Sequence, residues 1–114
     1  MNKSMIVFAM TMLFGCSRYE VSPLAGAARG GQIAEIRRLA KSGSDLNAGS
    51  GVNNWPPIMH AVHKHQREAV KTLLELGADP NQMASGMNAT TMATSYGDTE
   101  TVQLLKSTKV IATF

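Results

Sequence analysis

The fold of this chain is decided by residues 70–81, VKTLLELGADPN, in which an amphipathic run is followed by a glycine and a turn. Val70, Leu73 and Leu74 are three and four positions apart, so a helix would present them on one buried face. Gly77 comes directly after the apolar run, where glycine favours the end of a helix because it adopts the left-handed conformation without strain. The aspartate, proline and asparagine that follow are typical turn residues. The stretch therefore predicts a helix that ends in a sharply defined loop.

The same pattern occurs once before, at an offset of 34 residues. Residues 36–47, IRRLAKSGSDLN, align with residues 70–81, and the preceding segments 22–31, SPLAGAARGG, and 56–65, PPIMHAVHKH, align at the same offset. A third copy begins at Asn88. An internal period of this length indicates a repeat protein, in which each unit buries its apolar face against the next unit.

Each unit is predicted to hold two helices joined by a tight turn. Pro23 and Pro57 fall where a first helix would begin, because proline suits the first helical turn. Gly31 and Gly97 fall at the turn between the helices, and His65 occupies the equivalent position of the second unit. Small residues in the first helices would permit close packing against neighbouring units, namely Ala27, Ala28, Ala61 and Ala93.

These features resemble the ankyrin-repeat family. The resemblance implies an all-α solenoid of about three helix-turn-helix units, at residues 22–55, 56–87 and 88–109. It also implies a binding protein with no catalytic residue, cofactor or metal. The family's Thr-Pro-Leu-His tetrapeptide is altered in every unit, so we expect an array less stable than a consensus one. Residues 110–114, with Val110, Ile111 and Phe114, are expected either to cover the last unit or to contact a partner.

The N-terminal segment has the layout of an export signal. Lys3 precedes an apolar run over residues 5–14, which is too short to span a bilayer as a helix. Residues 13–16 resemble the lipobox of bacterial lipoproteins, so residues 1–15 are expected to be a signal peptide, Cys16 the lipidated residue and residues 16–21 a tether. The protein would then be anchored in the cell envelope, in the periplasm or at the outer membrane. The alternatives are an unmodified thiol, or a cytosolic protein whose apolar start is one more core helix.

The resemblance places a partner-binding surface on the loops between units and on the outward side of the first helices. The expected partner is another protein, bound in an immunity or adaptor role. Arg29 and Ser95 belong to this surface, and the main candidates are Asn53, Asn54, Trp55, His60, His63, Met87, Met92 and Tyr96.

Other functions are less well supported by the sequence. The formal net charge is only +3, and the basic residues are scattered, so no nucleic-acid partner is expected. No phosphate-binding loop, zinc-binding helix or nucleophile elbow is present in the 114 residues. The alternative function is metal or small-ligand binding by His60, His63 and His65, although no carboxylate or thiolate accompanies them at ligand spacing.

Overall fold

The computed structural model describes the backbone of residues 20–112 and the side chains of residues 20–107. Within this range the chain is all helical, as predicted, and has no named strand. The helices form three successive pairs: α2 (Pro23–Arg29) with α3 (Ile33–Lys41), α4 (Pro57–His63) with α5 (Arg67–Leu76), and α6 (Ala89–Ser95) with α7 (Thr99–Ala112).

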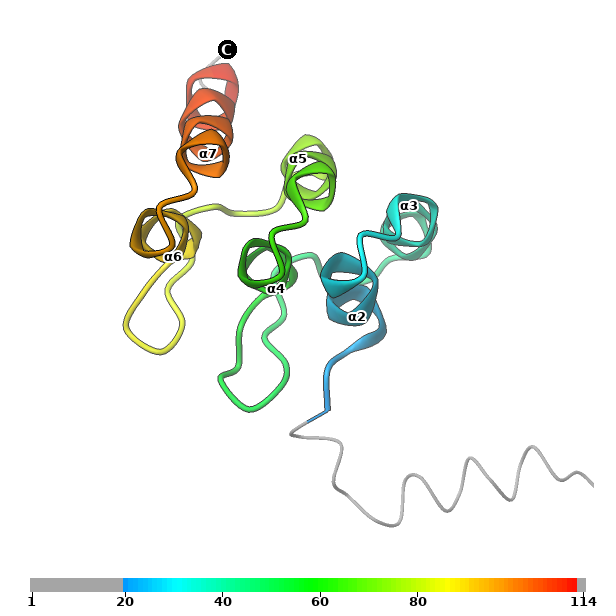
Figure 1. Ribbon diagram of the computed structural model, residues 1–114. Helices are drawn as coiled ribbons and strands as arrows, with labels where there is room; N and C mark the ends of the chain where they lie inside the picture. Colours follow the sequence, from blue (N-terminus) through cyan, green and yellow to red (C-terminus); the bar gives the residue numbers. More distant parts are fainter. Residues whose placement is uncertain (1–19, 113–114) are drawn as a thin grey trace, which may run out of the picture.

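The three pairs stack side by side in two layers. The short helices α2, α4 and α6 form one layer, and α3, α5 and α7 form the other (Figure 1). The loops between the pairs project on the side of the short helices, away from the second layer. The array therefore has one face bearing projecting loops and one face made by the outer helices.

The first helices begin where the sequence predicts. The Ser22 hydroxyl accepts a hydrogen bond from the backbone N–H of Ala25 at 3.1 Å, and Pro23 follows as the first helical residue. The Asn88 side chain caps α6 in the same way, through the N–H of Thr91 at 2.8 Å. Each cap satisfies a backbone donor that the helix itself leaves unpaired.

The turn between the two helices of each pair requires a left-handed residue. Gly31 has φ +66° and Gly97 has φ +72°, which confirms the expectation for these glycines. His65 takes the same conformation, with φ +58°, although its Cβ makes that conformation unfavourable. The repeat geometry therefore imposes the left-handed turn even where the sequence supplies no glycine.

The core lies between the two layers and continues through all three pairs. The predicted small residues Ala27, Ala28, Ala61 and Ala93 are buried, so the short helices approach one another closely. The second helices contribute larger apolar side chains from the predicted faces, including Ile36, Leu39, Val70, Leu73, Leu74 and Leu105.

The Asp-x-Asn segments join one unit to the next. In each segment the aspartate oxygen accepts the backbone N–H two residues later, at 2.9 Å in both Asp45 and Asp79. The Asn47 side-chain oxygen then accepts a hydrogen bond from the backbone N–H of Asp79 at 2.8 Å. The backbone carbonyl of Asn47 accepts a hydrogen bond from the Gln82 side-chain amide. The segment that marks the repeat in the sequence thus holds consecutive loops in register.

Several sequence expectations concern residues beyond the described part of the chain. The proposed signal segment, Cys16 and Phe114 lie outside it, and so do the side chains of Val110 and Ile111. The helix α7 extends to Ala112, past the boundary expected at residue 109. Among the described residues, no helix is long and apolar enough to cross a membrane.

Candidate functional site

The projecting loops end in two short hairpins. In hairpin 1, residues 50–55, the backbones of Ser50 and Trp55 exchange hydrogen bonds of 3.0 and 3.2 Å. In hairpin 2, residues 84–87, Ala84 and Met87 do the same at 2.8 and 3.1 Å. The two central residues of hairpin 2 both have positive φ, as a tight hairpin turn requires. Sequence reasoning placed both loops correctly but did not predict their hairpin form.

The hairpins lie beside each other and share one face. The Ser85 hydroxyl donates to the backbone carbonyl of Asn53 at 2.9 Å, which links the two hairpins directly. Both project from the layer of short helices (Figure 1). We call the surface formed by the two hairpins together with Val21, Met83, which directly precedes hairpin 2, and Tyr96 the hairpin face.

The exposed apolar side chains gather on this hairpin face. Among the described residues, the large hydrophobic side chains that remain exposed are Val21, Val52, Met83 and Tyr96, with exposures of 38%, 79%, 61% and 43%. Val21 adjoins hairpin 1, since the neighbouring Glu20 carbonyl accepts the N–H of Gly51 at 3.1 Å. A cluster of exposed apolar groups on one face is typical of an interaction surface.

A hollow of about 300 Å³ opens at the base of hairpin 1. The Trp55 ring lies in its wall, with its centroid 5.6 Å from that of His60 and 5.0 Å from that of His63. The indole N–H of Trp55 is buried without a hydrogen-bond partner, and its ring is packed against the two imidazoles instead. The full lining is Val21, Arg29, Gly51, Val52, Asn53, Trp55, His60 and His63.

His60 fastens hairpin 1 to the short helices. Its Nε2 lies 3.1 Å from the Ser50 carbonyl oxygen, and its Nδ1 lies 3.2 Å from Nη1 of Arg29. A carbonyl only accepts and a guanidinium only donates, so Nε2 carries the proton and Nδ1 accepts. The pKa of His60 is lowered, mainly by burial and further by the positive charges of Arg29 and His63. His60 is therefore a neutral, structural imidazole.

His63 extends the aromatic contacts toward the third repeat. Its Nδ1 lies 2.7 Å from the Tyr96 hydroxyl, and the two ring centroids are 6.0 Å apart. The pKa of His63 is lowered by its partial burial first, and then by the charges of Lys64, Arg29 and His65. Trp55, His63 and Tyr96, one from each of the three units, thus form a continuous aromatic row.

Not every residue expected on the binding surface is accessible. Met92 is only 2% exposed and His60 only 3%, so the expectation that they contact a partner directly is wrong. Both lie on the inward side of short helices, where a shift of one or two positions along the chain moves a side chain from the outward to the buried side. The other candidates keep accessible surface: Arg29, Trp55, His63 and Met87 are half-buried, and Asn53, Asn54, Ser95 and Tyr96 are exposed.

The three histidines do not converge. His60 uses both ring nitrogens in hydrogen bonds, whereas Nδ1 of His65 lies 3.9 Å from the Asp98 carboxylate on another part of the surface. Within residues 20–107, no group of three or more histidine, cysteine, aspartate or glutamate side chains is arranged to hold a metal ion. In the described structure the three histidines therefore do not form one ligand set.

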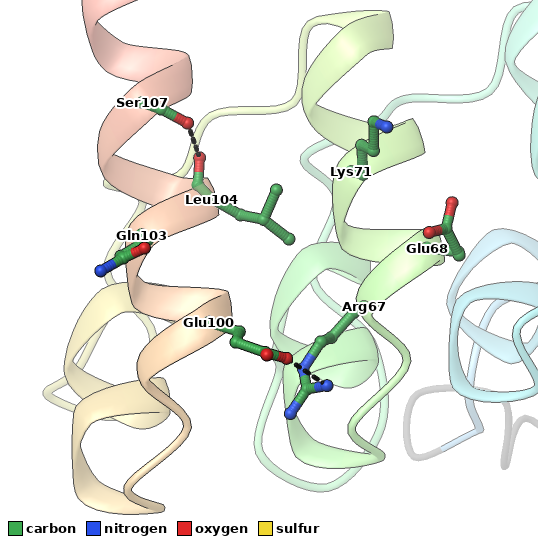
Figure 2. A pocket seen from close by; sticks show the side chains of 7 residues that line it. All are labelled: Arg67, Glu68, Lys71, Glu100, Gln103, Leu104 and Ser107. Atoms are coloured by element: carbon green, nitrogen blue, oxygen red, sulfur yellow. Dashed lines mark hydrogen bonds and ion pairs between the residues drawn. The ribbon is translucent and has the colours of Figure 1, made fainter.

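A second depression, of about 470 Å³, lies between α5 and α7 (Figure 2). Its mouth is crossed by Arg67, whose Nη1 lies 2.5 Å from Glu100 and whose Nη2 lies 3.2 Å from Asp98. Lys71 and Glu68 stand on the α5 side. The charge of Arg67 is thus already neutralised by two carboxylates of the neighbouring repeat. This pairing favours a structural role for the depression.

Sequence reasoning missed three contributors to the hairpin face. Val21 was assigned to a tether, and Val52 and Met83 were placed in the loops of the expected binding surface but not among its main candidates. The available signal was an apolar residue within a glycine- and asparagine-rich loop, where nothing nearby in the sequence could bury it.

Comparison of the sequence with known protein families agrees with the repeat fold described above. The sequence profile of ankyrin repeats (three copies) matches residues 5–84, which is more than half of the chain. The chain belongs to the ankyrin-repeat family. Ankyrin repeats are protein–protein interaction modules, typically without enzymatic activity. The matched range begins inside the apolar N-terminal segment and ends before α6, although the structure shows a complete third helix pair.

Individual relatives agree with this assignment. The chain is 36% identical over 89 residues to the rat ankyrin repeat and SAM domain-containing protein 6, and 34% identical over 83 residues to the human mitochondrial disaggregase. These matches cover 75% and 68% of this chain, but only 10% and 11% of the relatives. The crystal structure of the human ASB11 ankyrin repeat domain superposes with a TM-score of 0.67 at 26% identity, over 76% of this chain and 39% of that one.

Proposed function

We propose that this chain is an exported, lipid-anchored ankyrin-repeat protein that binds a partner protein in the cell envelope through its hairpin face. The observation that carries the binding surface is the exposure of Val21, Val52, Met83 and Tyr96, the large apolar side chains of the hairpin face. Burying such side chains against a partner is favourable by about 25 cal/mol for each Å² of apolar surface removed from water. The aromatic row behind them supplies rigid anchors of the kind that dominate interfaces.

The envelope address rests on the N-terminal sequence. Lys3, the apolar run over residues 5–14 and the cysteine at position 16 have the order of a lipoprotein signal. Acylation of Cys16 would hold the repeats at a membrane surface without a spanning helix. The sole cysteine leaves no intramolecular disulfide, so packing alone would stabilise the repeats outside the cytoplasm.

The first experiment is cross-linking purification of the tagged full-length protein from its native cells. We expect the wild type to capture a partner that a Val52→Ser/Met83→Ser variant loses, because this pair removes the most exposed apolar groups of the face. Lys71→Ser is the matched control, since Lys71 lies on α5 in the other layer. Equal capture by all three proteins would contradict the proposed surface.

The address is tested in the same cells with Cys16→Ala. We expect the wild type to fractionate with membranes and to incorporate a labelled fatty acid, and the variant to do neither. If the wild type does not incorporate the labelled fatty acid, lipidation would be contradicted. A soluble cytoplasmic wild type would favour the reading in which residues 5–14 are one more core helix.

Two narrower functions fit this proposal. The chain is either an immunity protein that covers the active site of a toxin, or an adaptor that links its partner to the envelope. A small binding module held at the envelope is suited to either. If the captured partner is a toxin, deletion of the gene for this chain should make the cells more sensitive to that toxin. Unchanged sensitivity would remove the immunity role and leave the adaptor role.

A further inference from the structure

Arg29 is an unusual arginine in this molecule. Among the described residues, Arg37, Arg38 and Arg67 each pair with a carboxylate at 3.2 Å or less. Arg29 is half-buried and forms no ion pair with a carboxylate of the described residues. Within the described part of the chain, its one side-chain hydrogen bond is to the neutral Nδ1 of His60, which occupies a single nitrogen of the guanidinium. The remaining N–H donors of Arg29 line the hollow without a charged partner.

The surroundings leave this positive charge uncompensated. Among residues 20–107, no aspartate or glutamate lines the hollow. The permanent charges that lower the pKa values of His60 and His63 are those of Arg29 and Lys64, and both are positive. Maintaining a half-buried charge without a counter-ion is costly, and a bound anion would offset that cost.

The rest of the hollow is shaped for a protein side chain. Val21 and Val52 form an exposed apolar rim, the Trp55 ring forms a wall, and Asn53 adds an amide. Gly51 lets the His60 ring pack against the hairpin backbone, because a Cβ at this position would lie 3.3 Å from that ring. The combination of one unpaired guanidinium with an apolar rim is complementary to a carboxylate flanked by apolar groups.

We infer that Arg29 and the hollow at hairpin 1 bind an acidic side chain, aspartate or glutamate, carried between apolar residues on a loop or extended segment of the partner protein. A guanidinium holds a carboxylate through charge-assisted, often paired hydrogen bonds, which fixes the orientation of the partner as well as its charge. The inference rests on the proposed function and adds the chemistry of the bound segment.

The test is a titration of the full-length protein with defined peptides, acetyl-Leu-Glu-Leu-Glu-Leu-amide and its glutamine counterpart. Trp55 is the only tryptophan, so its single indole N–H signal in NMR spectra reports on the hollow. We expect the glutamate peptide to shift this signal and to bind about ten-fold more tightly than the glutamine peptide. Inorganic phosphate at about the same concentrations should not saturate the shift.

Arg29→Met keeps the length of the side chain and removes its charge, so it should abolish the preference for the glutamate peptide. Arg37→Met is the matched control, because Arg37 is exposed on α3 and does not line the hollow; it should retain the preference. The comparison of the two peptides on the wild type needs no variant, so it remains informative even if Arg29→Met fails to fold.

Three results would overturn the inference: equal affinities of the two peptides, a preference that survives Arg29→Met, or saturation by phosphate below the peptide concentration. The last would indicate a phosphate site. These results are separate from the proposed function, which the cellular cross-linking tests. If capture of the partner is lost in Val52→Ser/Met83→Ser but retained in Arg29→Met, the proposed function would stand and the inference about an acidic side chain would be wrong.

Discussion

The hydrogen bonds from Arg29 through His60 to Ser50 join a short helix, its neighbour and hairpin 1 into one unit. His60 can serve as the middle member only while its imidazole is neutral, because Nδ1 must accept from a guanidinium. A second proton would place two positive charges in contact within a buried region. This single residue therefore makes the stability of the hairpin face sensitive to acid.

We expect the free energy of unfolding to fall as the pH is lowered below about 6.5. The pKa of His60 is below its ordinary value of 6.5 in the folded chain, so the unfolded chain takes up the proton first. The contribution is complete above pH 6.5 and decreases between this value and the folded pKa. Urea denaturation at about pH 7.5, 6.5 and 5.5 measures the effect.

His60→Gln isolates this contribution, since glutamine keeps one donor and one acceptor but does not titrate. The variant should show a smaller loss of stability between about pH 6.5 and 5.5 than the wild type. His63 also has a lowered pKa and titrates in the same window, so His63→Gln is the matched comparison. A slope that is unchanged in His60→Gln would assign the acid sensitivity elsewhere.

Asp98 is the most connected carboxylate of the described structure. Its side chain is 4% exposed and accepts hydrogen bonds from the Thr101 hydroxyl at 2.7 Å, from the Thr101 N–H at 3.3 Å and from Arg67 at 3.2 Å. Asp98→Ala should lower the free energy of unfolding by about 2 kcal/mol, because it removes a helix cap and charge-assisted hydrogen bonds. Asp45→Ala, which removes one exposed turn contact, should cost less than about 1 kcal/mol. Equal losses in urea denaturation would contradict this ranking.

The same carboxylate sets a second acid limit. Burial alone would raise the pKa of Asp98, but the hydrogen bonds from Thr101 and the charge of Arg67 outweigh it and lower the pKa below 3.8. Its contribution is present above pH 3.8 and is lost as the pH falls through the folded pKa. This window is well separated from that of His60.

Single-residue roles were only partly predictable. The spacing of His60 and His63 correctly indicated one helix, but the buried or outward direction of each depends on where the neighbouring short helix lies. The partner of His60 is a backbone carbonyl ten residues earlier, and sequence pattern carries no signal for such a contact. Trp55 was placed correctly at the base of its loop because the repeat period fixes the loop boundary.

At the scale of elements, the turn within each helix pair is set by backbone geometry. His65 adopts φ +58° where Gly31 and Gly97 adopt +66° and +72°, so its side chain is held in an unfavourable conformation. His65→Gly should raise the free energy of unfolding by about 1 kcal/mol by relieving it. Thermal and urea denaturation measure this change. They are carried out at about pH 7.5, because the contribution of His60 to stability is complete at that pH.

Gly97→Ala is the converse variant of the same turn. A Cβ at Gly97 would meet no atom within 4 Å, so the expected loss of about 1 kcal/mol comes from the backbone conformation alone. Opposite signs for His65→Gly and Gly97→Ala would establish the common turn. A loss of stability in His65→Gly would instead show that the ring contact of His65 with Tyr96, at 5.5 Å between centroids, outweighs the strain.

Helices were predictable where their limits are local, and hairpins were not. Ser22, Pro23 and Asn88 mark helix starts through bonds within a few residues, so composition alone identifies them. Hairpin 1 lacks an asparagine–glycine turn and is held instead by His60 and by its contact with hairpin 2. Those contacts arise only after the repeats have stacked.

At the scale of the whole molecule, stability depends on the number of repeats. Each helix pair packs mainly against the next, since α2 contacts α4, α4 contacts α6, and the outer helices follow the same order. A chain that ends at Met87 would expose the faces of α4 and α5 that now pack against the third pair. We expect this truncation to lose the cooperative unfolding transition in circular dichroism, because about three repeats are needed for independent stability. A sharp transition in the truncated chain would show that two pairs suffice.

The N-terminal segment allows a last distinction between two forms of the molecule. If residues 1–15 are a signal and residues 16–21 a tether, a chain that begins at Glu20 contains the whole folded unit and should melt within about 2 °C of the full-length protein. If residues 5–14 form one more core helix, as the start of the profile match at residue 5 would allow, their removal exposes apolar surface of the first pair. Losing about ten buried apolar residues would then lower the melting temperature by more than about 10 °C. An unchanged melting temperature, together with fatty-acid labelling that depends on Cys16, would assign the segment to export and leave the three helix pairs as the complete binding unit.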